Sequence, residues 1–283
     1  MRLIDHLKGL GHSNRAAQNL LRTGKVWHQG VPVGDAVREV TPETVEIRPR
    51  APRIRPGRDP AVLWHDEHMA IVWKPPGLLS VAAPRRREDN LVSLMARRFR
   101  AAHPVHRLDE PTSGVMMVAL TRKAQESIKE LLFRHDIERR YLAIVRGVPR
   151  SETSTISNSL VVDRGDGRRG SGHGPAAKNA TTHFRIVEPL GEAHTLVEAR
   201  LETGRTHQVR IHLSEANLPV LGDDRYAPPQ VVRAAPRLML HAWRLALRHP
   251  VTGQPLEITA PLPDDMARVR RDLLSGGGVP RHR

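Results

Sequence analysis

The hydrophobic and polar positions of the first 50 residues predict one short helix followed by short strands. Residues 13–24, SNRAAQNLLRTG, begin with Ser13, which can cap the first free amides of a helix, and end with Gly24, which suits its end. The apolar positions that share one face of this helix are Ala17, Leu20 and Leu21. The next segment, KVWHQGVPV, predicts two strands joined by a turn, and the alternation over residues 44–47 predicts a third strand.

A change of pattern at residues 48–60, RPRAPRIRPGRDP, indicates a boundary. Proline lacks the amide hydrogen that a helix needs and clashes with the preceding turn, so this segment predicts a linker. We therefore expect a small αβ N-terminal domain, a linker rich in proline and arginine, a large domain and a partly disordered C-terminal tail. The expected bounds are 1–50, 51–60, 61–265 and 266–283.

The large domain mixes many short apolar strands with few helices. Segments such as MAIVWK and YLAIVRG predict strands, whereas residues 90–101 and 122–134 have helical spacing. Strands outnumber helices and do not alternate regularly with them, which favours an α+β fold with a largely antiparallel, mixed β-sheet flanked by helices. Residues 163–178 hold five glycines and few large apolar side chains, and predict a mobile basic loop.

The composition indicates the class of partner and excludes one kind of chemistry. The 283 residues include 45 Lys and Arg against 30 Asp and Glu, a formal charge of +15, and a chain this basic usually binds a polyanion such as nucleic acid. The absence of cysteine excludes disulfides and thiolate chemistry. The first residues, MRLIDHLKGLGHS, lack a continuous apolar segment, so we expect a cytoplasmic protein without a membrane span.

One carboxylate stands in a setting that suits catalysis, within HRLDEPTSG at residues 106–114. Leu108 and the apolar run after residue 114 can anchor this segment in a core. The small residues from Pro111 to Gly114 enforce a tight loop, which would hold Asp109 at the edge of packed structure. A carboxylate held in this way can attack an electrophilic carbon. From spacing alone, Asp109 could equally be a turn residue or one half of a surface ion pair.

A second polar stretch, LETGRTHQVRIHL at residues 201–213, places Arg205 and His207 on a loop that runs into an alternating segment. As a strand, this segment would project Arg210 and His212 to the face opposite its apolar residues. A buried arginine needs a partner, because burying an unpaired charge is costly, and Asp109 is the candidate. The alternative is an amphipathic strand whose arginine faces water.

Together, these stretches resemble a known family. The pair HRLDEPTSG and GRTHQVRIH is similar to the RluA-type pseudouridine synthases, which carry an HRLD-x-x-TSG loop and, further along, GRTHQ-[IV]-R. The loops of the RsuA-type and TruB-type synthases differ from this pattern. The segments that also align in order are DEHMAIVWKPPGLL, RRYLAIVRG, KNATTHF, PVLGDDRYA and LHAWRLALRHPVTGQPLEITAPLP. Residues 1 to 50 resemble, more loosely, a small S4-type RNA-binding domain, with WHQG where V-N-G is usual.

The resemblance implies isomerisation of a uridine within RNA, without cofactor or metal. The bond from N1 to C1′ breaks, the uracil turns, and C5 bonds to C1′. Asp109 corresponds to the essential aspartate, which acts on the sugar or the base, and Arg210 to the arginine that orients it. Tyr141 corresponds to the aromatic residue that stacks on the flipped base, and Arg107 to the residue that fills the vacated space. Lys74, in the KPPG turn, is assigned a structural role.

The partner implied is ribosomal or transfer RNA, bound by a protein that we expect to be monomeric. Basic side chains would contact RNA phosphates, which adds affinity that weakens with salt. The expected RNA-binding residues are Arg15, Arg22, Lys25, Arg85, Arg86, Arg87, Arg97, Arg98, Arg107, Arg205 and His207. Each helical cation, taken singly, could instead face solvent, and the N-terminal domain could instead only pack on the enzyme.

Other functions fit the sequence less well. A non-catalytic RNA-binding or ribosome-associated protein that retains the fold is the main alternative, but it has no chemical reason to keep Asp109, Tyr141 and Arg210 together. His65 and His68 form the closest histidine pair and lack the spacing of a metal site. Glycoside hydrolysis needs two cooperating carboxylates, and consecutive side chains such as those of Asp109 and Glu110 do not normally converge on one bond.

Overall fold

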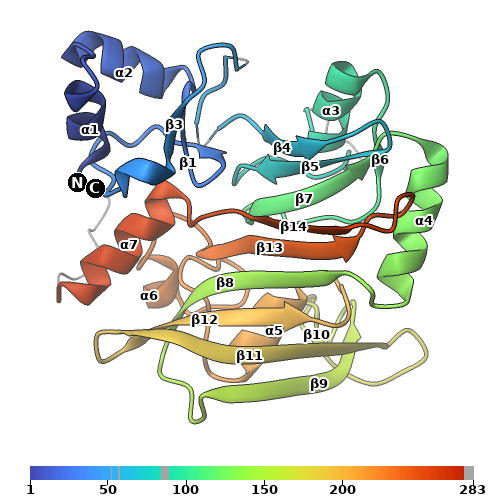
Figure 1. Ribbon diagram of the computed structural model, residues 1–283. Helices are drawn as coiled ribbons and strands as arrows, with labels where there is room; N and C mark the ends of the chain where they lie inside the picture. The colour runs from blue at the N-terminus through green and yellow to red at the C-terminus, as the bar shows by residue number, and fades with distance from the viewer. Residues whose placement is uncertain (52, 57, 84–88, 277–283) are drawn as a thin grey trace. The chain divides into compact units, whose positions relative to one another are not determined.

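The computed structural model describes residues 1–51, 53–56, 58–83 and 89–276, and the chain divides into two compact units (Figure 1). Unit 1 comprises Met1–Glu126 and Ile258–Asp264, and unit 2 comprises Ser127–Glu257 and Asp265–Arg283. These units follow packing and differ from the domain bounds expected from the sequence, which stay a prediction. Helix α4 and strand β14, at Arg122–Phe133 and Pro255–Thr259, each contain residues of both units.

Unit 1 begins with two helices and a three-stranded antiparallel sheet in the order β2-β1-β3. Their bounds are α1 Leu3–Gly9, α2 Asn14–Arg22, β1 Val26–His28, β2 Val31–Pro32 and β3 Val45–Ile47. The prediction for α2 is confirmed, because the Ser13 hydroxyl accepts a hydrogen bond from the Ala16 amide at 3.2 Å. The predicted turn is also confirmed: Gln29 and Gly30 both have positive φ, as a two-residue hairpin requires. Helix α1 is not predicted from the sequence pattern.

The predicted linker has no helix or strand among the described residues of 48–60. It is nevertheless packed against the N-terminal elements. The Ile54 amide donates to the Thr23 carbonyl at 3.3 Å, and the Lys25 ammonium donates to the Ala51 carbonyl. Gly24 must be glycine here, because its φ is +68° and a Cβ would collide with the Ile54 side chain.

The rest of unit 1 is built on an antiparallel sheet in the order β7-β5-β4, with β6 beside β7. The bounds are β4 Ala61–His65, β5 Met69–Lys74, α3 Leu91–Phe99, β6 His103–Pro104 and β7 Ser113–Ala119. Every residue of β5 and β7 is buried, which explains their continuous apolar sequences. Both predicted helices, α3 and α4, are confirmed to within a few residues.

Unit 2 contains an antiparallel sheet in the order β10-β9-β11-β12-β8-β13 (Figure 1). Its strands are β8 Glu138–Arg146, β9 Thr153–Val161, β10 Gly170–Ser171, β11 Lys178–Leu190, β12 His194–Leu201 and β13 Leu240–Arg248. The predicted class, α+β with a largely antiparallel sheet, is therefore confirmed. Strand β10 lies within the predicted loop 163–178, where the Ser171 amide donates to Glu215 at 2.9 Å.

The remaining helices of unit 2 include one correction. They are α5 Gln208–Glu215, α6 Pro229–Val232 and α7 Asp264–Leu274. The prediction that residues 209–213 form a strand is wrong, because they lie in α5. All six residues from Gln208 to Leu213 are buried, so the sequence shows neither the helical nor the strand pattern of a half-exposed element.

The predicted tail starts inside helix α7. Its apolar residues Met266, Val269 and Leu273 are buried, with the spacing of one helical face. Arg270 pairs with Glu188 of β11 at 2.6 Å, which ties the helix to the sheet of unit 2. The last part of the predicted tail, residues 277–283, lies outside the described residues. Within the described ranges, no helix is long and apolar enough to cross a membrane.

Candidate active site

The turn that carries Asp109 is fixed at both ends in unit 1. Its first end is Leu108, which is buried and exchanges two hydrogen bonds with the Ser80 hydroxyl, at 3.0 Å to the amide and 2.6 Å to the carbonyl. At the other end, the Thr112 amide donates to the Asp109 carbonyl at 3.1 Å, which closes the turn. Asp109 itself is half-buried. This is the setting expected from the sequence, a carboxylate at the edge of packed structure.

Lys74 stabilises the same turn through hydrogen bonds from its buried ammonium group. Its side chain is fully buried, and its ammonium donates to the carbonyls of Pro75, Leu78 and Glu110 at 3.0, 2.8 and 3.0 Å. The Gly77 amide adds a hydrogen bond to the Glu110 carbonyl at 2.8 Å. A buried ammonium is costly unless its hydrogen bonds are made, so this cation stabilises one arrangement of the two loops. The contacts agree with the structural role expected for Lys74.

Tyr141 lies on β8 in unit 2, between two strands with small residues. Its register partners are Ala199 on β12 and Ala242 on β13, and the tyrosine is 8% exposed. Residues directly opposite in a sheet share a face, so alanine on either side limits steric crowding around the ring. The strand therefore presents one aromatic ring on a face otherwise lined by small side chains at this position.

Arg139, two residues before Tyr141, is a buried arginine that the sequence analysis did not single out. Its guanidinium is buried and donates from Nη2 to the Glu202 carbonyl at 3.1 Å. Burial lowers the pKa of Arg139, and Tyr141 opposes that change. A Cβ on Gly204 would lie 2.5 Å from Nη1, so the glycine of GRTHQ allows the loop to approach the arginine. The sequence contained a signal for this residue: side chains two positions apart on a strand share a face, so Arg139 lies on the same face of β8 as Tyr141.

Gln208 organises the loop before α5. It is buried, and its Oε1 accepts from the Thr203 hydroxyl at 2.8 Å and the Arg205 amide at 2.9 Å. Its Nε2 donates to the Thr181 carbonyl and the Thr182 hydroxyl at 3.0 and 2.9 Å. All the hydrogen-bonding capacity of the amide is used. The loop is thereby fixed to β11, with Arg205 exposed beside it.

Arg210 forms a buried, two-pronged ion pair with Asp223. Its Nε and Nη2 donate to the two carboxylate oxygens at 2.8 and 2.6 Å, and the side chains are 2% and 1% exposed. The Asp223 carboxylate also accepts from the amides of Arg225 and Tyr226 at 3.0 and 3.1 Å. Asp223, which the sequence analysis did not select, therefore fixes the guanidinium plane. The pairing of Arg210 with Asp109, a residue of unit 1, stays a prediction.

Tyr226 links His207 to Arg210. Its hydroxyl lies 2.8 Å from Nδ1 of His207, and the Arg210 guanidinium carbon lies 5.2 Å from the centre of its ring. His207 has a φ of +61° at the start of α5, which lies in the left-handed region and not in regular helix geometry. The two predicted residues His207 and Arg210 are thus brought together through the second tyrosine of the chain.

His212 occupies a buried polar network behind this cluster. Its Nδ1 and Nε2 lie 2.9 Å from the Thr182 hydroxyl and the Asn158 amide oxygen. Asn158 in turn donates to Ser171 at 2.7 Å. Burial lowers the pKa of His212 to about 4, so the imidazole is neutral at neutral pH. Its role in the described structure is to join α5 to β9, β10 and β11.

The other expected RNA-binding residues differ in their surroundings. Arg15, Arg22 and Arg107 are exposed, whereas Arg97 forms a two-pronged ion pair with Asp89, both bonds at 2.8 Å. Arg98 lies over the Phe99 ring at 5.5 Å, and burial lowers its pKa. Arg85, Arg86 and Arg87 lie outside the described residues. RNA contact by each of these side chains, and by Lys25, stays a prediction.

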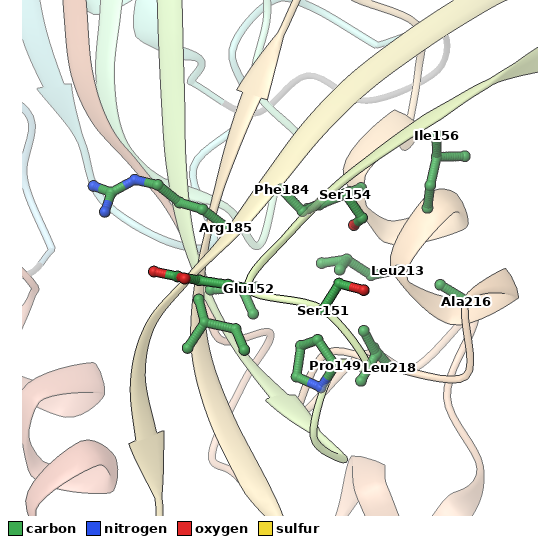
Figure 2. Close-up of a pocket in the computed structure, with 12 residues that line it drawn as sticks. Pro149, Ser151, Glu152, Ser154, Ile156, Phe184, Arg185, Leu213, Ala216 and Leu218 are labelled. Carbon is green, nitrogen blue, oxygen red and sulfur yellow. The ribbon is translucent and has the colours of Figure 1, made fainter.

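An apolar pocket of about 300 Å³, a volume that includes space open to solvent, lies beside α5 in unit 2 (Figure 2). Its lining includes Ile156, Phe184, Leu213, Ala216 and Leu218. None of the predicted site residues lines it. Figure 2 shows the charged groups of Glu152 and Arg185 together at one side of the pocket, away from Leu213 and Ala216. The lining also includes Ser151 and Ser154, but no histidine among the described lining residues lies beside them to act as a base, so we assign the pocket no catalytic role. Among the described residues, no group of three or more His, Asp or Glu could hold a metal ion.

Comparison with known proteins gives a consistent set of relatives. The RNA pseudouridylate synthase family matches residues 68–215, which include Asp109, Tyr141 and Arg210. An uncharacterised RNA pseudouridine synthase, YlyB of Bacillus subtilis, is 36% identical over 225 residues, which cover 76% of this chain and 73% of that protein. The dual-specificity RNA pseudouridine synthase RluA of Escherichia coli K12 is 36% identical over 203 residues, covering 71% of this chain and 92% of RluA.

Solved structures show the same fold. Human RNA pseudouridylate synthase domain containing 4 aligns with a TM-score of 0.62 and 23% identity, covering 76% of this chain and 93% of that one. Human RNA pseudouridylate synthase domain containing 1 aligns with a TM-score of 0.61 and 25% identity, covering 72% and 84%. Residues 1–67 lie outside the family match, so the resemblance of residues 1–50 to an S4-type domain is a separate question.

Proposed function

The chain belongs to the RNA pseudouridylate synthase family, and from that premise we propose that Asp109, Tyr141 and Arg210 are its catalytic residues, acting on ribosomal or transfer RNA. The family's reaction is the isomerisation of uridine to pseudouridine within RNA. The observation that carries the assignment is the rigid support of each side chain. A hydrogen-bonded turn holds Asp109, two alanines flank Tyr141, and a buried carboxylate holds Arg210.

The reaction moves one bond without adding or removing atoms. The bond between N1 and C1′ breaks, the uracil rotates, C5 bonds to C1′, C5 loses its proton and N1 gains one. The Asp109 carboxylate acts as the nucleophile on the sugar or the base, and the turn between Leu108 and Thr112 keeps it in place for either attack. No step needs an external oxidant or reductant, so the proposal includes neither cofactor nor metal.

Access to the reacting bond requires that the nucleotide leave its stack. That extrusion costs about a few kcal/mol, which contacts in the pocket must offset. We assign the stacking contact to the Tyr141 ring, because its neighbours on both strands are alanines. Arg107 is exposed two residues before Asp109, which suits a side chain that occupies the vacated space. Arg210 orients Asp109 with a guanidinium plane that Asp223 fixes.

The N-terminal elements are proposed to act as an S4-like RNA-binding domain. Exposed Arg15 and Arg22 on α2 support this, since they lie on the solvent side of a helix whose other face is buried. One relative is named a ribosomal large subunit pseudouridine synthase and another a dual-specificity RNA pseudouridine synthase, and we propose ribosomal or transfer RNA as the substrate. The protein is proposed to act in the cytoplasm as a monomer.

The main alternative is an RNA-binding protein without turnover, and one assay separates the two. RNA that carries tritium at C5 of uridine loses the label to water when C5 bonds to C1′. The purified protein should release tritium from unmodified ribosomal or transfer RNA transcripts in proportion to the pseudouridine formed. RNA binding without any release would support the binder instead. Pseudouridine mapping of cellular RNA with and without the gene then identifies the position that is modified.

A further inference from the structure

A second cavity of unit 2 opens on the sheet face opposite Tyr141. Tyr141 pairs with Ala199 in the register of β8 and β12, and the next pair is Arg140 with Arg200. Successive side chains of a strand point to opposite faces, so these two arginines lie on the other face from Tyr141. The cavity has about 780 Å³, including space open to solvent, and we call it the arginine pocket. Its basic and threonine side chains are Arg140, Thr153, Thr155, His183, Arg185 and Arg200.

Two arginines and one histidine of the arginine pocket lie in one cross-strand row. Arg140 is opposite Arg200, and Arg200 is opposite His183 in the register of the sheet. Like charges directly opposite destabilise a sheet, so a second arginine at this position is not explained by folding. Arg200 is exposed, and among the described residues it forms no salt bridge within 4 Å, although its charge, after the hydrogen bond from Arg140, helps to lower the pKa of Glu138. Its charge is therefore available to a ligand.

One carboxylate, Glu198, lies at the floor of the pocket, and it is already engaged. It is 3% exposed and accepts from Nη1 of Arg140 at 3.0 Å and Nε of Arg185 at 2.7 Å. The pocket lining thus holds three arginines against one glutamate, a net charge of +2. Glu198 orients two of the arginines, and Glu138, outside the lining, pairs with Arg140 at 2.9 Å, so the charge that remains for a ligand is mainly that of Arg200.

We propose that the arginine pocket binds a phosphate of the RNA backbone, as a contact separate from the active site. The proposal rests on RNA being the partner of this protein. Planar guanidinium groups beside threonine hydroxyls suit a phosphate, which accepts several hydrogen bonds at once. Phe184 lies between His183 and Arg185 on β11, so its ring projects to the opposite face of the sheet and offers no platform for a base beside the arginines. The contact therefore reads the backbone and carries no sequence preference.

A polar strip leads from the pocket to the GRTHQ loop. Cross-strand side-chain hydrogen bonds of 2.9 Å follow one another along β9 and β11, and they join Thr155 to His183, Ser157 to Thr181, and Ser159 to Asn179. At the end of the strip, the Asn179 carbonyl accepts from Nε of Arg205 at 2.9 Å. An RNA strand that leaves Arg205 can thus follow hydroxyl and amide groups to the arginine pocket.

The test uses a fluorescent, single-stranded RNA of about 20 adenosines, which contains no uridine to isomerise. Arg200→Glu should weaken its binding about tenfold and Arg200→Ala less, and the slope of log Kd against log salt should fall by about 0.7 for the loss of one phosphate contact. The matched control is Arg150→Glu, an exposed arginine of the same unit outside the pocket lining, with an expected effect below about twofold. Circular dichroism verifies that each variant is folded.

Equal effects of Arg200→Glu and Arg150→Glu, or no effect of either Arg200 variant, would overturn the proposal. An oligoglutamate peptide is the second probe. If Arg200→Glu weakens the binding of this peptide and not that of the RNA, the pocket takes an acidic protein segment and the RNA assignment is wrong. Tritium release by the unaltered protein is measured in parallel. If the protein releases tritium but the Arg200 variants bind RNA normally, the proposed function stands and the pocket assignment is wrong. If the Arg200 variants lose RNA binding but the protein releases no tritium, the pocket assignment stands and the proposed function is wrong.

Discussion

The Arg210 guanidinium and the Asp223 carboxylate face each other along two parallel hydrogen bonds of 2.8 and 2.6 Å, with both side chains almost completely buried. The guanidinium comes from α5 and the carboxylate from the segment that precedes Tyr226. Two backbone amides complete the coordination of the carboxylate. The orientation of the proposed catalytic arginine is therefore set by a residue outside the catalytic trio.

Removal of Asp223 should destabilise the protein strongly. Asp223→Ala leaves a buried guanidinium without its main partner, which costs about 3–5 kcal/mol in the free energy of unfolding. The neighbouring residue supplies the control. Asp224 is 76% exposed and lies 3.4 Å from Arg210, a longer contact than that of Asp223, so Asp224→Ala should lower the free energy of unfolding by less than about 1 kcal/mol. Urea unfolding of the two variants measures the difference. Similar losses of unfolding free energy for both variants would show that the buried pair of Arg210 and Asp223 is not the source of the stability.

The pKa of His212 predicts a pH dependence of stability. Burial lowers the pKa of His212 to about 4 from the ordinary value of about 6.5, so the unfolded chain binds a proton at a pH where the folded protein does not. The contribution of His212 to the free energy of unfolding is therefore complete above about pH 6.5. It is lost as the pH falls towards 4, by up to about 3 kcal/mol. His212→Gln should show a smaller loss of unfolding free energy between pH 7 and 4.5. His173→Gln, at an exposed position, should keep the full dependence, and equal curves for both variants would contradict the prediction.

Lys74 should affect turnover through the Asp109 turn. Lys74→Met keeps most of the side-chain volume but removes the shared donor of three carbonyls, of which that of Glu110 keeps the Gly77 amide, and the loss should cost about 2 kcal/mol of unfolding free energy. We expect tritium release per bound RNA to fall, because the turn that carries Asp109 loses its support. Lys129→Met, at an exposed position of α4, serves as the control and should retain both stability and turnover. Unchanged turnover in a folded Lys74→Met would refute the positioning role.

Local signals in the sequence predicted the elements that depend on neighbouring residues. Ser13, the apolar face of α2 and Gly24 lie within one segment, so the start, core side and end of this helix could all be identified. The alternation of β3 and the two residues with positive φ between β1 and β2 are similarly local. The Asp109 turn could also be predicted from the sequence, because its small residues directly precede an apolar strand.

Long-range burial explains what the sequence did not predict. Residues 208–213 alternate in polarity and read as a strand, but Thr182, Asn158 and Asp223 satisfy their polar side chains inside the protein. Neither the helix nor the Asp223 partner follows from local spacing. Arg139 was overlooked for the same reason, since its partner is a backbone carbonyl 63 residues away.

The most direct test of the account compares the unaltered protein with Asp109→Asn in the release of tritium from C5-labelled uridine in RNA. The substitution keeps the shape of the side chain and removes the charge of the proposed nucleophile. We predict rapid release by the unaltered protein and no release above background by the variant, with RNA affinity changed by no more than about a few fold, since backbone contacts supply most of the binding. Full release by purified, folded Asp109→Asn would contradict the central claim that this carboxylate carries the reaction.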